Sequence, residues 1–192
     1  MLYHKLYHVS KTPGLKTLLP RVSTHGKAYV YAIEDLTTGL LFGARQDDFD
    51  FHISTDESGK PVVCECYPGA FEKVYKGKSC SVYEVSGEGF LRGMTSWEPE
   101  LVCGQEVSVL CEIFVEDLYE RLLMEEQNGN LTVCRYEFSD GYRQKIAAHI
   151  VDRIFRFGID LEHIAEEDAR FAEYYNGIVK ALSAAADGRL LR

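Results

Sequence analysis

Hydrophobic and polar residues follow two different periods along this chain, and the change of period divides the sequence. In the first part apolar residues often alternate with polar ones; Phe49, Phe51 and Ile53, for example, are separated by single polar residues. Such alternation is typical of a β-strand with one buried face. Clusters of Gly, Asp and Ser mark turns between these segments. Strands are therefore predicted over residues 6–10, 28–33, 49–54, 62–67, 80–85 and 107–115.

The last of these predicted strands is the longest and the most regular. Its apolar residues recur at every second position, at Val107, Val109, Cys111, Ile113 and Val115. Since side chains alternate between the two faces of a strand, all five are expected on the same face.

Beyond residue 116 the spacing of apolar residues becomes helical. Leu118 and Leu122 are four residues apart and follow two acidic residues, which are favoured near a helix N-terminus. Further along, isoleucine recurs at every fourth position from Ile146 to Ile154, and Gly158 predicts the end of that helix. Two more helices are predicted, a short one over residues 35–43 and a last one over residues 166–186.

Strands followed by helices indicate an α+β fold. We expect small mixed or antiparallel sheets over residues 1–115 and a helical C-terminal extension, packed on them, over residues 116–192. The helical part contains no catalytic motif, so it is interpreted as a packing cap or a partner surface. A run of acidic residues near its start is interpreted as a solvated helix face: Glu112, Glu116, Asp117, Glu120, Glu125 and Glu126.

Composition and charge narrow the class of protein. With 46% hydrophobic and 27% charged residues, the 192-residue chain has the composition of an ordinary globular protein. No apolar stretch approaches the ~20 residues of a membrane span, and the N-terminal residues lack the layout of a signal peptide, so cytoplasmic localisation is expected. The net charge is −9, but the first 45 residues carry six Lys or Arg against two acidic residues. This local excess favours a confined anion site and argues against strong binding to duplex DNA.

The sequence lacks the motifs of several other chemistries. Its six cysteines include no pair with the two-residue gap of zinc ribbons or redox motifs, so buried or incidental free thiols are expected. His4 and His8 share a face at a spacing of four, but no third ligand stands nearby, and no metal is expected. There is also no Gly-x-Gly-x-x-Gly, no P-loop and no Gly-x-Ser-x-Gly elbow.

Three segments, in this order, carry a resemblance to a known family. They are Leu6-Tyr7-His8-Val9-Ser10, then Val30-Tyr31-Ala32 ahead of a short helix with Phe42-Gly43, and then Ser81-Val82-Tyr83-Glu84-Val85 followed by residues 95–102. Together they resemble the N-terminal half of small ADP-ribosyltransferase-fold proteins over residues 6–114. The likeness is greatest to the rifamycin-modifying and diphtheria-toxin-like branches and more distant to the RNA 2′-phosphotransferases.

The resemblance implies that NAD is the substrate and that its nicotinamide–ribose bond is cleaved through an oxocarbenium-like transition state. On this analogy His8 binds a ribose of NAD, and Tyr31 stacks on the nicotinamide with Phe42 as a second wall. A cation would face the pyrophosphate, and a carboxylate would stabilise the developing positive charge. Glu98 is the candidate carboxylate, and Glu88 in a Gly-Glu-Gly loop is its rival. The implied site comprises His8, Val9, Ser10, Arg21, Lys27, Tyr31, Phe42, Glu88 and Glu98.

Other interpretations of the same residues stay open. The glycine that follows the histidine in the family is Val9 here, and a glycine lets a ligand approach the backbone closely. His8 also fits a hydrogen-bonded structural histidine, Tyr31 a half-buried strand residue, and Trp97, the only tryptophan, a core anchor. The prediction is an NAD-dependent ADP-ribosyltransferase acting on an unknown protein, nucleic acid or small molecule. The alternatives are an inactive nucleotide- or protein-binding module of the same fold, or a structural interaction protein.

Overall fold

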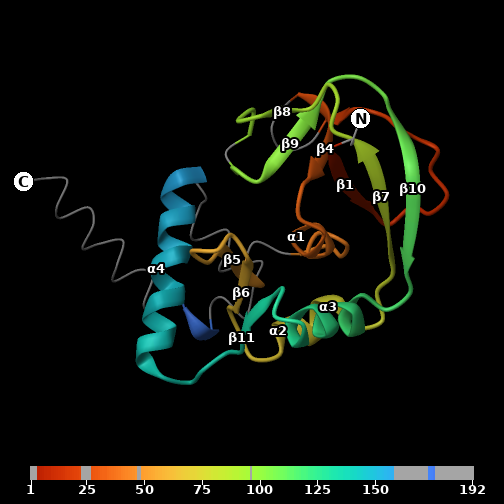
Figure 1. The fold of residues 1–192 in the computed structure, drawn as a ribbon. Helices are drawn as coiled ribbons and strands as arrows, with labels where there is room; N and C mark the ends of the chain where they lie inside the picture. Colours follow the sequence, from red (N-terminus) through yellow and green to blue (C-terminus); the bar gives the residue numbers. More distant parts are fainter. Residues whose placement is uncertain (1–3, 23–26, 47–48, 96, 158–172, 176–192) are drawn as a thin grey trace, which may run out of the picture. The chain divides into compact units, whose positions relative to one another are not determined.

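The computed structural model describes residues 4–22, 27–46, 49–95, 97–157 and 173–175. In this part the protein is a mixed α+β structure whose strand pairs are mostly antiparallel (Figure 1). The strands are β1 (Lys5–Ser10), β2 (Thr17–Leu18), β3 (Arg21–Val22), β4 (Ala28–Ile33), β5 (Phe51–Thr55), β6 (Pro61–Glu65), β7 (Cys80–Ser86), β8 (Leu91–Arg92), β9 (Glu100–Cys103), β10 (Val107–Val115) and β11 (Thr132–Cys134). The helices are α1 (Leu36–Leu40), α2 (Ala70–Tyr75), α3 (Leu118–Gln127) and α4 (Asp140–Phe157). The predicted helix over residues 166–186 lies outside the described residues, apart from residues 173–175.

The chain divides into two compact units, which are interleaved along the sequence. The first comprises residues 1–46, 57–61 and 74–132. The second comprises residues 47–56, 62–73 and 133–192. Helix α3, which the helical period places in a C-terminal extension, belongs to the first unit, where it contacts α1.

A large sheet forms the framework of the first unit. Its strand order is β2-β10-β7-β1-β4-β9-β8, and β3 pairs with β4 beside this path. Figure 1 shows β1, β7 and β10 running side by side. The β1–β7 pairing extends without interruption from Lys5–Ser86 to Ser10–Ser81. Because side chains alternate along each strand, this register fixes which residues share a face of the sheet.

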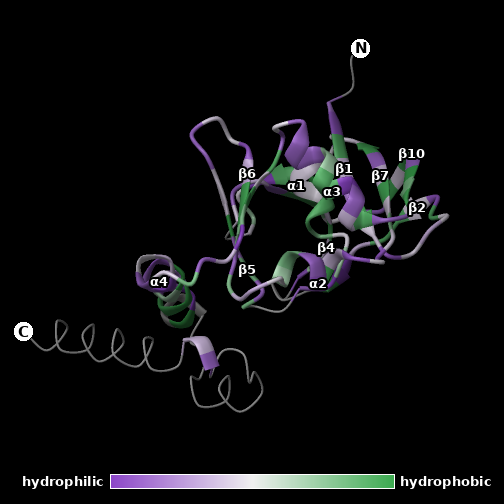
Figure 2. Ribbon diagram, turned by 90° about the horizontal axis from the view of Figure 1, so that it is seen from below, coloured by the Kyte–Doolittle hydropathy of each residue, from purple (hydrophilic) through white to green (hydrophobic). Residues whose placement is uncertain are grey.

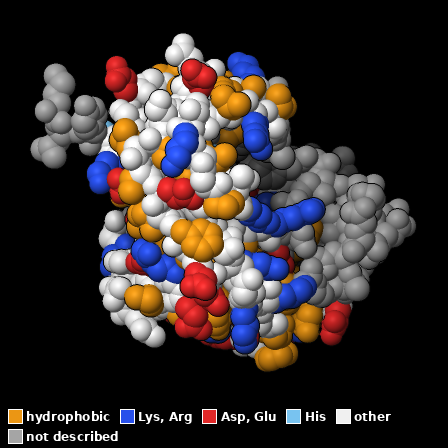
Figure 3. Space-filling view, turned by 90° about the vertical axis from the view of Figure 1, so that its right-hand side faces the viewer, with side chains coloured by type: hydrophobic (Ala, Val, Ile, Leu, Met, Phe, Trp, Pro, Cys, Tyr) orange, Lys and Arg blue, Asp and Glu red, His pale blue; other side chains and the backbone are white. Residues whose placement is uncertain are grey.

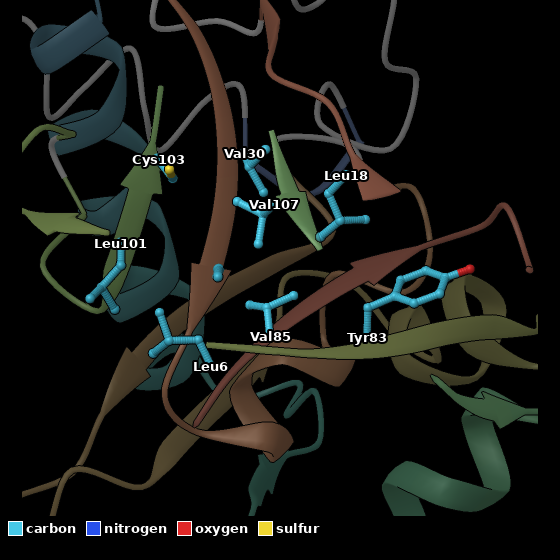
Figure 4. Close-up of a cluster of buried hydrophobic side chains, with 9 residues drawn as sticks. Leu6, Leu18, Val30, Tyr83, Val85, Leu101, Cys103 and Val107 are labelled. Atoms are coloured by element: carbon cyan, nitrogen blue, oxygen red, sulfur yellow. The ribbon is translucent and has the colours of Figure 1, made fainter. Parts of the chain in front are cut away.

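One face of this sheet carries a cluster of buried hydrophobic residues (Figure 4). Leu15, Phe90 and Val109 pack around its border. Burial of this apolar surface is the main source of stability for the sheet, at roughly 25 cal/mol per Å² removed from water. The buried members of the cluster are Leu6, Leu18, Val30, Ala32, Tyr83, Val85, Leu101, Cys103 and Val107.

The opposite face of the sheet is covered by α1. Asp35 caps this short helix, since its carboxylate accepts a hydrogen bond from the Thr38 N–H at 2.6 Å. Close approach to the strands depends on Gly39, where an added β-carbon would lie 3.1 Å from a methyl of Ile33. The helix therefore packs directly onto the strand that precedes it.

A buried carboxylate joins α1 to α3. Glu125 is 7% exposed and accepts hydrogen bonds from Arg121 at 2.9 Å, Asn130 at 2.8 Å and Thr37 at 3.3 Å. Burial of Glu125 works against ionisation, but the hydrogen bonds outweigh it and hold the pKa of Glu125 below its ordinary value. The prediction that Glu125 belongs to a solvated helix face is wrong, because its carboxylate is buried and accepts hydrogen bonds from three side chains.

Strand β10 contains a bulge that changes which residues face the core. Val109 pairs with Val85, but the next recorded pair is Cys111–Glu84. The extra residue turns Cys111 to the opposite face and brings Glu112 to the face of the hydrophobic cluster. The prediction that the alternating apolar residues of this strand share one face is therefore wrong, and so is the interpretation of Glu112 as part of a solvated helix face.

The second unit is built on a three-stranded sheet of order β11-β6-β5. Helix α4 has one hydrophobic and one hydrophilic side in Figure 2. Its residues Ile146, Ile150 and Ile154, which recur at every fourth position, are buried. The helical period predicted for residues 139–157 is confirmed.

A buried carboxylate holds two backbone segments of the second unit. Glu65, 3% exposed, accepts hydrogen bonds from the backbone N–H groups of Phe71 at 2.8 Å and of Tyr136 at 2.9 Å.

The cysteines are free thiols, as expected. Cys64, Cys66, Cys80 and Cys103 are buried, whereas Cys111 is exposed. Burial raises the pKa of Cys64 and Cys66 to about 12 and that of Cys80 to about 11. These three side chains are protonated near neutral pH and act as small apolar residues.

Candidate functional site

His8 marks the point where β1 and β4 separate. The two strands are joined at the register pair Tyr7–Ile33. One residue further along β1, the Nδ1 atom of His8 lies 2.7 Å from the backbone oxygen of Tyr31. The His8 side chain thus connects β1 with β4 at the point where the strands separate. It does so through the backbone of Tyr31, the other residue on which the predicted site is centred.

The protonation state of His8 follows from its surroundings. Burial disfavours the imidazolium and lowers the pKa of His8; the bond to Tyr31 opposes this effect, and nearby Arg21 adds to it. A carbonyl oxygen only accepts hydrogen bonds, so in the neutral ring Nδ1 carries the hydrogen and Nε2 is the acceptor. Near neutral pH, His8 is therefore suited to accept a hydrogen bond from a ligand hydroxyl.

His8 and Tyr31 direct their side chains to opposite faces of the sheet. His8 faces its register partner Tyr83, with ring centroids 6.4 Å apart and planes at 30°. Tyr31 follows Val30, which belongs to the hydrophobic cluster on the face of His8, so Tyr31 points to the other face. There its ring meets Tyr29 edge-on at 6.1 Å. A ligand that touches both predicted residues must extend around the end of the β1–β4 pairing.

Val9 and Ser10 are engaged within the protein. A methyl of Val9 lies 3.4 Å from the position that a β-carbon on Gly39 would occupy, so Val9 packs against α1. The hydroxyl of Ser10 accepts a hydrogen bond from the Thr12 N–H at 3.1 Å. The residue that replaces the family's glycine thus fills space left by a glycine on the neighbouring helix.

An aromatic pair stands at the end of α1. Phe42 follows the helix and is 48% exposed, and its ring centroid is 5.1 Å from that of Trp97, with planes at 57°. The Trp97 carbonyl accepts hydrogen bonds from the N–H of Glu100 at 3.1 Å and from the hydroxyl of Thr95 at 3.3 Å. The structure thereby brings together the second and third segments of the predicted site. Ser96, within the third segment, lies outside the described residues.

The two predicted carboxylates occupy exposed turns. Glu98 lies in the turn before β9, and its backbone oxygen accepts a hydrogen bond from Arg92 at 3.0 Å. Glu88 lies in the turn after β7, where its N–H donates to the Ser86 hydroxyl at 3.3 Å. Neither contact fixes the carboxylate itself.

Glu100 is a third carboxylate, which was not among the predicted site residues. It is half-buried, begins β9 and is the register partner of Ile33, while Val102 is the partner of Tyr31. Residues that face one another across a ladder share a face, so Glu100 lies on the same face as Tyr31, diagonally across the two strands. The sequence signal that could have identified Glu100 is its spacing of two residues from Val102, which places both on one face of β9. That strand was not predicted.

The cations predicted to face a pyrophosphate lie on both sides of residues that the structure does not describe. Arg21 pairs with Tyr29 between β3 and β4, and it is close enough to His8 to lower the pKa of that residue. Lys27 is exposed immediately before β4. By its register Arg21 shares the face of Tyr29 and Tyr31, and its charge nevertheless reaches His8.

An ion-pair network fixes the turn that carries Trp97 and Glu98. Arg92 contacts Glu34 at 2.7 Å, and His4 contacts the other oxygen of the same carboxylate at 2.7 Å. The hydrogen bond from Arg92 is the main reason why the pKa of Glu34 is lowered. Since Glu34 follows β4 directly, the network ties this turn to the end of the strand that carries Tyr31.

Comparisons with protein-family models, with curated proteins and with solved structures find no match. Among the described residues, no three His, Cys, Asp or Glu side chains gather as metal ligands. None of the described helices has the length and apolar character to cross a membrane. On the face drawn in Figure 3, basic side chains are interspersed with acidic and hydrophobic ones. Any function of the site is therefore argued from the positions of its own residues.

Proposed function

We propose that the protein binds NAD where β1 and β4 separate and transfers its ADP-ribosyl group to an acceptor, with the fold of the ADP-ribosyltransferases. The observation that carries this proposal is the half-buried side chain of His8, whose Nδ1 atom lies 2.7 Å from the Tyr31 carbonyl oxygen at the end of the β1–β4 pairing. The proposal is supported by the aromatic pair Phe42–Trp97 and by the carboxylate of Glu100 on the face of Tyr31.

The proposed reaction breaks the bond between the ribose C1′ and the nicotinamide nitrogen, and the electron pair leaves with nicotinamide. The positive charge on the ribose is stabilised by Glu100 until a nucleophile of the acceptor adds to C1′ and gives its proton to that carboxylate. His8 accepts a hydrogen bond from a ribose hydroxyl through Nε2. Tyr31, or the Phe42–Trp97 pair on the same side, stacks on the cationic nicotinamide ring. Arg21 and Lys27 would face the pyrophosphate.

The binding step is tested by fluorescence, because Trp97 is the only tryptophan and its emission reports on the site directly. NAD should quench this emission saturably in the native protein, and Tyr31→Ala should abolish the effect while thermal unfolding stays cooperative. Phe114→Ala is the matched control, since Phe114 is an aromatic residue on β10 that is 57% exposed. No saturation at millimolar NAD in the native protein would contradict the proposal.

The catalytic carboxylate is tested with three matched variants: Glu100→Gln, Glu98→Gln and Glu88→Gln. Release of nicotinamide from NAD should fall by about 100-fold or more in Glu100→Gln, because a neutral amide does not stabilise the cationic ribose. NAD binding should remain, and the other two variants should release nicotinamide at nearly the native rate. Loss of activity in Glu98→Gln alone would show that Glu98, in the exposed turn, is the catalytic carboxylate and that Glu100 is not.

A second candidate function is nucleotide binding without turnover. It is favoured by Val9 and Ser10, which are engaged in packing and in a turn rather than left for a ligand. A thermal-shift series with NAD, ADP-ribose and nicotinamide separates the two functions, since a ligand that binds only the folded state raises the melting temperature. Stabilisation by NAD without release of nicotinamide would favour this second function.

A further inference from the structure

The turn that follows β1 is held by side chains from two other strands. In this Lys11–Lys16 turn, the Thr12 carbonyl accepts a hydrogen bond from the Tyr83 hydroxyl at 2.6 Å. The Gly14 N–H donates to the Glu112 carboxylate at 2.9 Å. Figure 4 shows the Tyr83 ring at the border of the hydrophobic cluster, with its hydroxyl pointing away from the other labelled side chains.

The Tyr83 hydroxyl and the Glu112 carboxylate act as one unit, because they also contact each other. The Tyr83 hydroxyl accepts a hydrogen bond from the Leu15 N–H at 3.2 Å and lies 3.2 Å from the Glu112 carboxylate. The same carboxylate oxygen accepts a hydrogen bond from Ser81 at 2.7 Å. Several contacts hold the pKa of Glu112 below its ordinary value, and the hydrogen bond from the Gly14 N–H has the largest effect. The Glu112 carboxylate therefore stays ionised near neutral pH.

Tyr83 connects this turn with His8. Its ring faces the imidazole, while its hydroxyl bonds the turn, so a single residue contacts both. Lys11 and Lys16 are exposed at the two ends of this turn, whose backbone accepts a hydrogen bond from Tyr83 on the face of His8. Positive charge is thus available on the side of the sheet opposite to Tyr31.

We propose that Tyr83 and Glu112 are positioning residues, which hold the Lys11–Lys16 turn beside His8 so that its lysines contact the pyrophosphate of the bound dinucleotide. This inference rests on the proposed function and divides the ligand between the two faces of the sheet. The nicotinamide end lies on the face of Tyr31, and the phosphate end lies on the face of His8.

The physical reason is preorganisation. A lysine on a free turn loses backbone and side-chain freedom when it binds a phosphate, and that loss subtracts from the binding free energy. Here the backbone at Thr12, Gly14 and Leu15 is already fixed by hydrogen bonds from the sheet. Removing the anchors should weaken binding of phosphate-bearing ligands and leave the stacking of nicotinamide unchanged.

The experiment compares the native protein with Tyr83→Phe, which keeps the ring over His8 and removes the hydroxyl. Calorimetry with NAD and ADP-ribose should give Kd values about tenfold higher in the variant, which corresponds to about 1.4 kcal/mol. The Kd for nicotinamide alone should not change, and neither should the pKa of His8 measured by NMR. Tyr119→Phe, a hydroxyl deletion on α3, is the matched control. Amide exchange should become faster at Gly14 and Leu15.

A double variant, Lys11→Ala with Lys16→Ala, keeps the inference falsifiable if Tyr83→Phe fails to fold. It should weaken NAD and ADP-ribose by the same order and spare nicotinamide. Native-like Kd values in either folded variant overturn the inference alone, and so does an equal weakening of all three ligands. If the native protein binds neither NAD nor ADP-ribose, the proposed function is wrong and this inference is wrong with it.

Discussion

The imidazole of His52 on β5 lies face to face with that of His149 on α4, with ring centroids 3.5 Å apart and planes at 9°. After burial, repulsion from His149 is the largest cause that disfavours a positive charge on His52. Lys145 and Arg153, one helical turn before and after His149, act in the same direction, and Asp152 opposes them less strongly. Burial and this positive surrounding lower the pKa of His52 to about 4, and burial likewise lowers the pKa of His149. The stack therefore joins β5 and α4 through two uncharged rings.

The second unit is expected to lose stability in mild acid. The folded pKa of His52 is about 4, below the ~6.5 of an unfolded histidine. The lowered pKa contributes stability that is fully present above pH ~6.5 and is lost as the pH falls towards 4. After allowance for solvent screening, the loss should be about 1–2 kcal/mol. Amide exchange in α4, followed from pH 7.5 to 4.5, measures it.

His149→Phe is the matched variant for this prediction. Phenylalanine keeps a flat ring against His52 and removes one titrating group together with its repulsion. The exchange rates of α4 should then depend less steeply on pH, once corrected for intrinsic exchange. A dependence as steep as that of the native protein would show that other groups control the acid response.

Gly43→Ala should destabilise the first unit. An added β-carbon would lie 2.8 Å from the sulfur of Cys80 and 2.9 Å from a methyl of Leu118, so buried groups must move. Overpacking of this kind costs about 1–3 kcal/mol of unfolding free energy. Urea denaturation measures the change. Gly104→Ala is the control: its added β-carbon would meet nothing within 4 Å, and the expected change is within about 0.5 kcal/mol.

Glu125→Ala should destabilise the contact between α1 and α3. It leaves Arg121, Asn130 and Thr37 without their shared acceptor in a buried position. The expected loss is about 2–4 kcal/mol, and Glu125→Gln should lose less because it keeps one acceptor oxygen. Denaturant unfolding of both variants checks the order. Equal losses would mean that shape, and not hydrogen bonding, governs this site.

Arg92→Met should change the environment of Trp97 with little effect on stability. The Arg92–Glu34 pair has side-chain exposures of 42% and 44%, so its loss should cost less than about 1 kcal/mol. The hydrogen bond to the Glu98 carbonyl would also be lost, and the turn beside Trp97 should become more solvated. A red shift of the tryptophan emission at an unchanged melting temperature is the expected result. An unchanged emission spectrum would contradict the role assigned to Arg92.

The spacing of apolar residues along the chain was sufficient to predict several of the helices and strands that bury one face. The predicted strands over residues 28–33 and 107–115 agree with β4 and β10, and the isoleucine repeat agrees with α4. The two-residue strands β2, β3 and β8 were missed because they are too short to display a period. Helix α2 was missed because its six residues are too few to show an amphipathic repeat, and so short a helix depends on tertiary packing for its stability.

The candidate site was predictable in its residues and less so in its geometry. His8 does meet Tyr31, but through a backbone oxygen, and the two side chains face opposite ways. Glu98 and Glu88 were the predicted carboxylates, and Glu100 was not considered because β9 was not recognised. The register of β9 with β4 places Glu100 on the face of Tyr31. Pairing between strands distant in sequence carries this information, and no local pattern encodes it.

Leu110, within the bulge of β10, has a role that does not depend on its side chain, which is 57% exposed. Its presence adds one residue of length, and this length selects the face to which Glu112 belongs. Substitutions at this position should therefore be well tolerated, whereas deleting the residue should not be. Over evolutionary time, the spacing between Val109 and Glu112 should be kept more strictly than the identity of Leu110.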